Sequence, residues 1–388
     1  MSPPPALESW ALFWHSTGLA QLGGASALMP LLAGVLLILV FVREFEPVFL
    51  LSLGFAALLV ALPGSGLGEP GGLLYLLYEG GVRSGVLPGL FFLGLGLLAD
   101  FTPLIALPAL LYVGVAAQLG VFVTLWLLGS LNGLLGWNLA WADVGVAALL
   151  GGANLPSLLF STDRLAPHLL GPALLALYAG VALLPRLQPP LLRLLTTAEE
   201  RRVVMESPRA VSVGERLLFA LLLLLLGLLL FPAIAPLLAL LVLGNMLRES
   251  ALLDRLLTGH SATLPVRLLP LASLLLGLAV GGRLTVGRLF SPESLLLLGC
   301  VVLAFAVGTA SGVGMGKWLR RQGFASLNPL LGGAGLAVLP LTARLAVAEA
   351  DAEGEGSRLL PYAMATNWAG VVGSVAAAGI LLAVLGGK

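Results

Sequence analysis

Long uncharged apolar stretches alternate with short charged segments along the whole chain. Such stretches cover Ala27–Val42, Val48–Pro63, residues 84–99, residues 101–142, Leu169–Pro185, Leu217–Phe231, Ala235–Leu247, Leu268–Gly282, Ser294–Gly316 and Tyr362–Leu385. A helix that crosses a bilayer needs about 20 apolar residues, and several of these stretches are nearer to about 15. We therefore expect an all-α polytopic membrane protein with about ten crossings, some of them tilted or broken.

The composition indicates the same class. The 388 residues are 59% hydrophobic and 10% charged, whereas soluble domains carry about 25% charged residues. So little polar surface cannot cover a soluble fold of this size, which excludes a soluble enzyme. The net charge of +1 leaves no basic field for nucleic acid. The single cysteine, Cys300, excludes a disulfide framework and a thiolate metal cluster.

Basic residues gather in two segments between the apolar stretches. The loop 186–216 holds six arginines, and a second cluster contains Lys317, Arg320 and Arg321. Because lysine and arginine concentrate in cytoplasmic loops, both segments are expected on the cytoplasmic side. The acidic stretch Glu349–Glu355 is expected on the opposite side.

The chain contains an internal repeat. Leu149–Ala166 reads LLGGANLPSLLFSTDRLA and Leu330–Ala346 reads LLGGAGLAVLPLTARLA, about 181 residues further on. Phe92–Asp100 (FLGLGLLAD) and Leu275–Arg283 (LLGLAVGGR) match at a similar offset. We therefore expect two homologous units at residues 88–187 and 270–388. The remaining parts are expected to be N-terminal scaffold spans at 1–87, a basic cytoplasmic loop at 188–216 and linking spans at 217–269.

Each LLGGA segment is expected to interrupt a span. Paired glycines and a nearby proline weaken a helix, and the freed backbone groups must face protein or a watery cavity. Interruptions at matching positions of two halves indicate a transporter's binding site near the midplane of the bilayer. The alternative is that these glycines only allow close helix packing, which is also our interpretation of Gly308–Lys317 (GTASGVGMGK).

Polar side chains follow both interruptions and suggest an ion site. Neutral oxygen groups with freed carbonyls suit a hard alkali cation, and the three scattered histidines argue against a transition metal. Arg344 is expected to be buried and to anchor an anion, or alternatively to reach the headgroups from a helix end. Asp100 is expected either to cap a helix or to lie on an ion path.

Taken together, these segments resemble the β subunit of the sodium-translocating, biotin-dependent decarboxylases of oxaloacetate, methylmalonyl-CoA and glutaconyl-CoA. The resemblance extends from about Phe41 to the C-terminus. It rests on EFEPVFLLSLGF, LLADFTPLIALP, LLGGANLPS, LQPPLLRLLTTAEER, LGNMLRESALLDRL, LGLAVGGRL, GTASGVGMGK, NPLLGGAG, VLPLTARLA and NWAGVVGS. It implies two inverted repeats, each with a broken helix or re-entrant hairpin whose tip lies in the membrane.

The resemblance also implies a function. Such a β subunit accepts carboxybiotin, decarboxylates it and couples this to sodium export, with a proton consumed from the outer side. Its implied partners are a carboxyltransferase α subunit, a biotin carrier protein and a small single-span γ subunit, with the β subunit forming an oligomer. The implied location is a prokaryotic plasma (inner) membrane.

The family's functional residues carry over only in part. The family's first interruption reads GGADGPT, and its aspartate is the sodium ligand and proton-exchanging acid; here Asn154 takes that position, followed by Leu155 and Ser157. A family tyrosine falls near Gly180, close to Tyr178. In the second interruption the family's Asn, Gly and Arg match Asn328, Gly332 and Arg344, whereas its Ser falls on Ala337.

The resemblance therefore implies a set of site residues. Carboxybiotin would contact Arg344 and Asn328, and the sodium ion would be bound by Asn154, Ser157, Asn328, Gly332, Thr342 and Asn367. Asp100 and Asp163 are candidates for an ion path and for replacing the lost acid. Because asparagine neither carries charge nor titrates, we expect altered or abolished coupling between sodium and protons. Two alternatives stay open: a secondary transporter or facilitator of an ion or small anion, and a non-catalytic membrane anchor.

Overall fold

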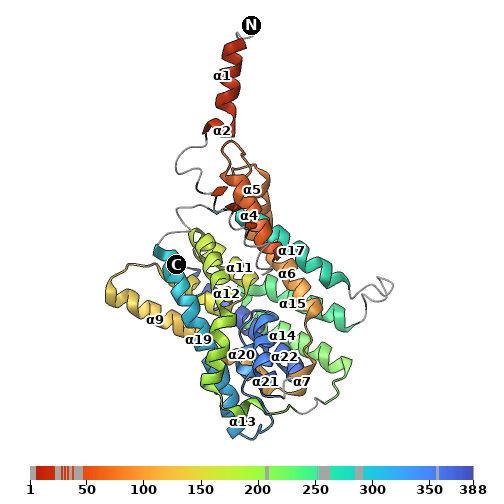
Figure 1. The fold of residues 1–388 in the computed structure, drawn as a ribbon. Coiled ribbons are helices and arrows are strands. Elements are labelled where there is room, and N and C mark those ends of the chain that lie inside the picture. Colours follow the sequence, from red (N-terminus) through yellow and green to blue (C-terminus); the bar gives the residue numbers. More distant parts are fainter. Residues whose placement is uncertain are drawn as a thin grey trace.

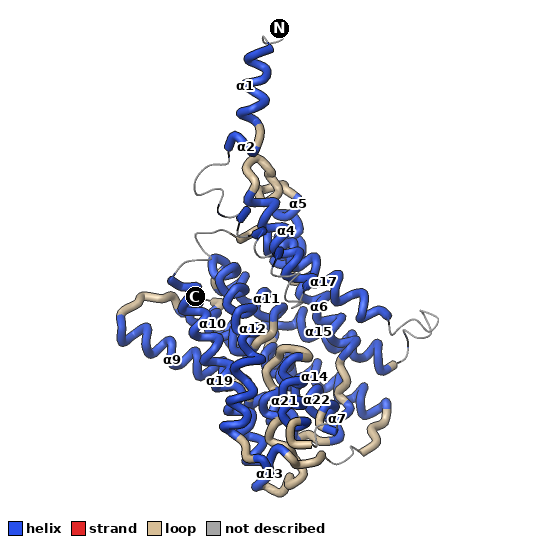
Figure 2. Tube along the Cα trace, viewed as in Figure 1, coloured by secondary structure: helices blue, strands red, loops and turns tan. Residues whose placement is uncertain are grey.

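The computed structural model describes residues 6–21, 47–205, 209–250, 263–284, 292–354 and 358–387, with isolated positions between 28 and 38 and at 252. These residues form helices and no strand (Figure 2). The all-α prediction is confirmed. The span expected at Ala27–Val42 lies largely outside the described residues, as does Glu355 of the acidic stretch.

The helices follow one another along the chain as Figure 1 labels them. Their bounds are α1 (Ala6–Ser16), α2 (Gly18–Gln21), α4 (Pro47–Ala61), α5 (Leu73–Leu77), η2 (Tyr78–Arg83), α6 (Val86–Leu98), α7 (Thr102–Ala106), α8 (Ala109–Ala116), α9 (Leu119–Leu135), α10 (Trp141–Leu149), η3 (Leu150–Gly152), α11 (Leu155–Leu165), η4 (Pro167–Leu169), α12 (Leu170–Leu195), α13 (Ala198–Arg201), α14 (Val213–Leu230), η5 (Pro232–Ile234), α15 (Ala235–Glu249), α17 (Thr263–Gly281), α19 (Pro292–Arg321), α20 (Leu331–Ala334), α21 (Leu341–Asp351) and α22 (Leu360–Leu385).

Seven helical segments among the described residues are long and apolar enough to cross a membrane. The count is eight if Leu73–Arg83 and Val86–Leu98, which meet at an angle of 58°, form one span. Coverage by the rest of the protein differs widely: 6% of the most apolar stretch of α14 is buried, against 67% for α22. The leucine run of α14 therefore faces outward, and α22 lies at the centre of the bundle.

The closest contacts between helices fall into two groups. In the outer group, α6 packs along α15 and α17, and α17 packs along α4. In the hairpin group, α19 packs against α8, α9 and α12, and α22 packs against α8. The hairpin group contains both LLGGA segments.

Small residues let the helices of the hairpin group come close together. A Cβ atom built on Gly120 of α9 would lie 2.3 Å from the carbonyl oxygen of Ala304 in α19. A Cβ atom on Gly312 of α19 would lie 2.4 Å from the carbonyl oxygen of Gly332. Gly308–Lys317 is thus part of one continuous helix and serves close packing, as the sequence predicted.

One face of the molecule is formed around residues 196–205, and we call it the loop face. Here Arg193 forms an ion pair with Glu349 at 2.7 Å, and Arg201 forms one with Glu353 at 2.6 Å. The hydrogen bond from Arg201 holds the pKa of the Glu353 carboxyl below its usual value. The expectation that this acidic segment lies opposite the basic loop was wrong, because its glutamates pair with the arginines of that loop.

On the opposite face, Nε2 of His168 lies 3.1 Å from a carboxylate oxygen of Asp143, and we call it the hairpin-base face. His168 precedes the 26-residue helix α12, and Arg193 lies near the far end of that helix. At about 1.5 Å per residue, α12 spans about 39 Å, enough to cross a bilayer. The two faces are therefore at opposite ends of the helix bundle.

Candidate functional site

The first LLGGA segment forms the tip of a hairpin that enters from the hairpin-base face. Helix α10 ends in the short 3-10 turn η3, and α11 returns toward the same face. Between them, Ala153 adopts a left-handed backbone with φ of 53°. Asn154 begins α11, and its side-chain oxygen accepts a hydrogen bond from the backbone N–H of Ser157 at 3.2 Å. The predicted interruption is therefore present, and Asn154 is the N-cap of the returning helix.

The second LLGGA segment forms the tip of a hairpin that enters from the loop face. Before the tip, the side-chain amide of Asn328 donates to the carbonyl oxygens of Arg201 and Val203 at 3.0 and 2.9 Å. After the tip, α21 returns to Glu349 and Glu353 on that same face. The two hairpins thus enter from opposite faces, which is the arrangement of inverted repeats.

Side-chain amides from three different helical segments hold the carbonyls of the second tip. Gln188 of α12 donates to the carbonyl oxygen of Gly333 at 2.7 Å, and Gln118, between α8 and α9, donates to that of Gly335 at 3.1 Å. Asn367 of α22 donates to the carbonyl oxygens of Ala334 and Leu336, both at 2.8 Å. We call Gln118, Gln188 and Asn367 the amide clamp.

Asn367 is the one member of the amide clamp that was predicted from the sequence, and the two glutamines were not. Thr342 was also predicted, and its hydroxyl donates to the carbonyl oxygen of Leu336 at 2.8 Å and accepts from Asn367 at 2.7 Å. A signal existed for Gln118, a polar residue inside the uncharged stretch 101–142, whereas Gln188 follows Arg186 in the segment predicted as a loop. A polar residue inside an apolar span needs buried partners, and the freed carbonyls of an interruption supply them.

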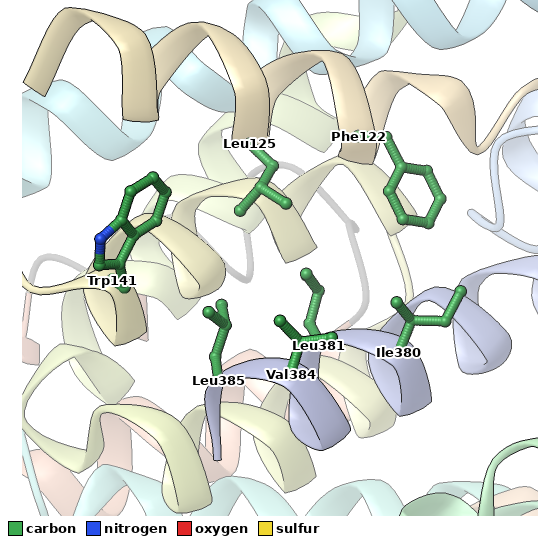
Figure 3. Close-up of a pocket in the computed structure, with 7 residues that line it drawn as sticks. All are labelled: Phe122, Leu125, Trp141, Ile380, Leu381, Val384 and Leu385. Atoms are coloured by element: carbon green, nitrogen blue, oxygen red, sulfur yellow. The ribbon is translucent and has the colours of Figure 1, made fainter. Parts of the chain in front are cut away.

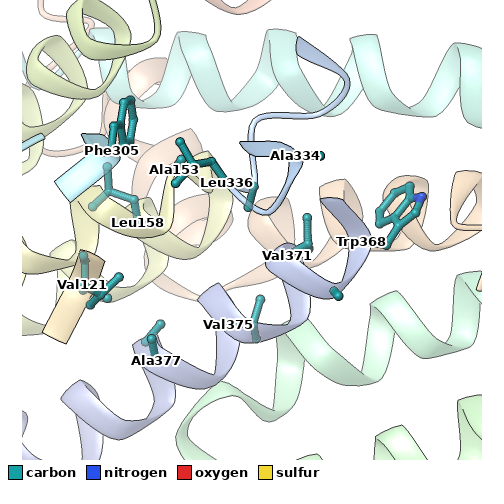
Figure 4. Close-up of a cluster of buried hydrophobic side chains, with 14 of the residues drawn as sticks. Val121, Ala153, Leu158, Phe305, Ala334, Leu336, Trp368, Val371, Val375 and Ala377 are labelled. Atoms are coloured by element: carbon teal, nitrogen blue, oxygen red, sulfur yellow. The ribbon is translucent and has the colours of Figure 1, made fainter. Parts of the chain in front are cut away.

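The two tips meet at a cavity of about 750 Å³ between the outer group and the hairpin group. Asn154 lines it from the first tip, and Ala337–Leu341 lines it from the second. Helices α4, α6 and α17 close the other side, for example with Phe49 and Ser273. Figure 4 shows Ala153 of the first tip and Leu336 of the second in one buried cluster beside this region.

The electrostatic character of the cavity is positive. Arg344 is the only charged residue among the described residues that line it, and no acidic residue lines it. The N-terminal end of the 11-residue helix α11 also points there, beginning at Asn154. A helix N-terminus and a guanidinium both favour an anion.

Arg344 is exposed rather than buried, so that part of the prediction was wrong. It lies in the first turn of α21, at the open cavity, and water there avoids the cost of burying a guanidinium. Tyr178 also lines the cavity, with its ring stacked on Phe49 at 5.3 Å. Gly180, where the resemblance placed a family tyrosine, packs against Val301 and Phe305 instead.

The structure does not bring all the predicted residues to the cavity. Asn328 lies on the loop face, and Gly332 packs against α19. Asp100 is 52% exposed and accepts a hydrogen bond at 2.9 Å from the backbone N–H of Thr102, the first residue of α7. Asp163 lies at the far end of α11 from Asn154.

A second cavity of about 340 Å³ lies between α9, α10 and α22 (Figure 3). Its lining is hydrocarbon apart from the indole nitrogen of Trp141. Such a depression on an apolar helix bundle suits lipid tails and offers no group for chemistry. Elsewhere, no group of three or more His, Cys, Asp or Glu residues among the described residues could hold a metal ion.

These features define a polytopic helical membrane protein in which two opposed hairpins meet at a cavity, as in transporters. A family model described as the Na⁺-transporting oxaloacetate decarboxylase beta subunit matches residues 25–385. The chain belongs to this family.

Curated relatives resemble the chain over nearly its whole length. The methylmalonyl-CoA decarboxylase subunit beta of Propionigenium modestum is 37% identical, over 96% of this chain and 98% of the relative. The glutaconyl-CoA decarboxylase subunit beta of Acidaminococcus fermentans is 35% identical, over 96% and 97%. The oxaloacetate decarboxylase beta chain of Klebsiella pneumoniae is 34% identical, over 97% and 99%.

Proposed function

We propose that this chain is the membrane subunit of a decarboxylase-driven sodium pump, in which it accepts carboxybiotin and decarboxylates it. The observation that carries this proposal is the cavity at the two tips, which combines Arg344 and the N-terminus of α11 with no acidic residue. That charge distribution suits a carboxylate. The names of the relatives support decarboxylation as the reaction class.

The cavity has groups for each part of the decarboxylation. Arg344 holds the carboxylate of carboxybiotin, and the positive end of the α11 dipole at the same cavity favours that charge. Phe49 and other apolar side chains make up most of the cavity lining, which favours neutral CO₂ over the carboxylate. Cleavage of the N–C bond leaves an electron pair on the biotin nitrogen, which must take up a proton. Tyr178 lines the same cavity, and we assign its hydroxyl as the donor of that proton.

Sodium is assigned to the polar groups around the tips. Asn154 and Ser157 offer neutral oxygens at the first tip, and Thr342 and Asn367 lie at the second. Asn328 acts from the loop face, where it fixes the segment that a carrier protein would approach. Because Asn154 cannot exchange a proton, coupling of sodium to protons is altered.

The partners and setting follow from the same proposal. The chain works with a carboxyltransferase α subunit, a biotin carrier protein and a small single-span γ subunit, and forms a homo-oligomer. It lies in a prokaryotic plasma membrane with the loop face toward the cytoplasm, because the arginines of residues 186–216 gather there. The units 1–87, 88–187, 188–216, 217–269 and 270–388 keep the roles expected from the sequence.

A second candidate function is transport of a small anion without decarboxylation. The same positive cavity favours it, because an exposed arginine and a helix N-terminus without a nearby acid bind anions in general. In that case the protein would move anions when reconstituted alone.

The test is reconstitution of the chain with its α, carrier and γ partners in liposomes, measuring CO₂ release and ²²Na⁺ uptake together. Arg344→Ala should lower decarboxylation about tenfold or more, since a charged hydrogen bond to the carboxylate is lost. Asn154→Asp should increase the sodium moved per CO₂. Arg209→Ala, an exposed arginine paired with Glu215, is the control and should change neither rate.

Three results would contradict parts of the proposal. Unchanged decarboxylation in Arg344→Ala would show that carboxybiotin does not bind at Arg344 in the cavity. Equal sodium transport by the unaltered chain and by Asn154→Asp would contradict the proposal that coupling is altered. Anion flux through the chain without its partners would establish the second candidate instead.

A further inference from the structure

A buried acid near the hairpin-base face has no role in the cavity. Asp163 lies in the last turn of α11 and is 8% exposed. Its described partner is the hydroxyl of Tyr78, which donates to the carboxylate and is itself 3% exposed. A buried carboxylate is costly unless it is paired or protonated, so this acid needs an explanation.

Asp163 differs from the other buried acids of the described residues. Glu349 is paired with Arg193 at 2.7 Å, and Glu249 is paired with Arg216 at 2.9 Å. No basic side chain among the described residues forms such an ion pair with Asp163. A neutral phenol is its partner instead, which leaves the carboxyl free to change its charge without breaking a salt bridge.

Three arginines surround Asp163, each bonded to another group. Arg164 lies over the ring of Phe160 at 3.5 Å and donates to the carbonyl oxygens of Phe160 and Arg83. Arg83 pairs with Glu79 at 3.0 Å. Arg283, just after α17, lies 5.0 Å from the centre of the ring of Tyr78. Glu79, the partner of Arg83, is the acidic group on this side of Asp163.

Asp163 and Tyr78 lie close to the water at the hairpin-base face. Arg83 and Arg164 are exposed, so Asp163 lies one layer below the hairpin-base face. Tyr78 begins the π-helical segment Tyr78–Arg83, and such segments occur frequently at functional sites. Asp163 lies nine residues along α11 from Asn154, which is about 13 Å.

We propose that Asp163 and Tyr78 form a proton-binding site that opens to the hairpin-base face, on the same helix whose other end is the neutral cap Asn154. Water on that face gives one proton to the Asp163 carboxylate, and no other bond breaks. Before the transfer the phenol donates to the carboxylate, and after it the carboxyl O–H can donate to the phenol oxygen. The hydrogen bond between α11 and η2 therefore persists in both states.

The inference rests on the proposed function only for the use made of the bound proton. In the pump, this site would supply the exchangeable proton that Asn154 cannot. Binding of the proton itself requires no partner subunit and no decarboxylation. The two ideas can therefore be tested separately.

The first experiment is infrared difference titration of the full chain in lipid nanodiscs. The chain has five aspartates, so labelling aspartate carboxyl groups with ¹³C identifies their bands in the unaltered protein. We expect one buried carboxyl band that grows with acidification, is absent from Asp163→Asn and is displaced in Tyr78→Phe. Glu69→Gln, which changes an exposed acid outside this cluster, is the control and should leave this band unchanged.

Asparagine at position 163 can still accept the hydrogen bond from Tyr78, so Asp163→Asn is expected to fold. If it does not, the labelled unaltered protein and Tyr78→Phe still decide the matter. Absence of a titrating aspartate band sensitive to Tyr78→Phe would overturn the proposal, and the pair would be a fixed structural contact.

The second experiment uses the reconstituted complex. Asp163→Asn should abolish the dependence of sodium uptake on the pH at the hairpin-base face, while carboxybiotin decarboxylation continues. If the unaltered complex pumps sodium and Asp163→Asn keeps the same pH dependence, the proton site is refuted and the pump assignment stands. If the complex does not pump but the infrared band titrates, the pump assignment fails and the proton site stands.

Discussion

The two hairpin tips begin with the same five residues, LLGGA, and are held in opposite ways. At the second tip, four consecutive carbonyls, from Gly333 to Leu336, accept hydrogen bonds from the amide clamp. At the first tip, Asn154 of the tip itself caps α11, and Ala153 is held in a left-handed conformation. Equal sequences thus give one tip fixed by its neighbours and one fixed by its own cap.

The difference indicates that the two tips have different roles in the site. The second tip is anchored to α12, α22 and the junction of α8 and α9, so it moves only if those helices move with it. The first tip presents a helix N-terminus to the cavity and depends on few outside bonds. We infer that the second tip serves as the fixed wall and the first as the adjustable one.

The largest effect is expected from a methyl group at the second tip. In Gly332→Ala the new Cβ atom would lie 2.0 Å from the nitrogen of Val313 and 2.1 Å from the carbonyl carbon of Gly312. Both are backbone atoms of α19, so the variant should lose more than about 3 kcal/mol of folding free energy and yield little folded protein.

The matched substitution at the first tip is Gly151→Ala, since both glycines are the first of their LLGGA segments. Its Cβ atom would lie 2.8 Å from the Cβ atom of Ala304 and 3.0 Å from the nitrogen of Val121, which is less tight than at Gly332. Size-exclusion chromatography in detergent should show more folded Gly151→Ala than Gly332→Ala. The control Gly299→Ala meets no atom within 4 Å and should behave as the unaltered chain. Equal yields for Gly332→Ala and Gly151→Ala would contradict the contrast between the tips.

A smaller effect is expected from removing one amide of the clamp. Gln118→Leu leaves the carbonyl of Gly335 buried without its donor, which costs about 1–3 kcal/mol. Thermal unfolding should show a lowered midpoint, and amide hydrogen exchange should increase at residues 333–336. Gln322→Leu changes an exposed glutamine and should leave both measurements unchanged. If the two variants were equally stable, the clamp would not hold the tip.

Loss of the cap at the first tip should cost less. Asn154→Ala removes the acceptor for the N–H of Ser157, and a lost N-cap costs about 1 kcal/mol. Hydrogen exchange should rise at the first turn of α11 and stay unchanged at the second tip. A midpoint lowered more by Asn154→Ala than by Gln118→Leu would reverse our assignment of the fixed and adjustable walls.

The smallest effect concerns the base of the second hairpin. Because Arg201 lowers the pKa of Glu353 in the folded protein, the pair stabilises the loop face above the ordinary carboxyl pKa of about 4.3. This contribution disappears as the pH falls through the lowered value. Hydrogen exchange at residues 196–205 should therefore rise on acidification. In Glu353→Gln it should already be raised at neutral pH, and a response equal to that of the unaltered chain would exclude Glu353 as the cause.

The sequence predicted the helical class, the family and both interruptions, because each depends on local composition. It predicted Asn154 and Arg344 near the site, and the cavity contains both. The exposure of Arg344 and the pairing of Glu349 with Arg193 depend on how distant helices pack. Gln188 and Tyr178 gain their roles from neighbours that are far away in the sequence, so neither stands out without the fold.

Ala153 has a consequence beyond the shape of the first tip. An alanine with φ of 53° occupies a region that costs an L-residue about 1–2 kcal/mol. Any rearrangement that lets this residue return to an ordinary conformation recovers that energy, which corresponds to about a tenfold change in population. A glycine at position 153 would remove this cost, and it should therefore stabilise the first tip in its present conformation.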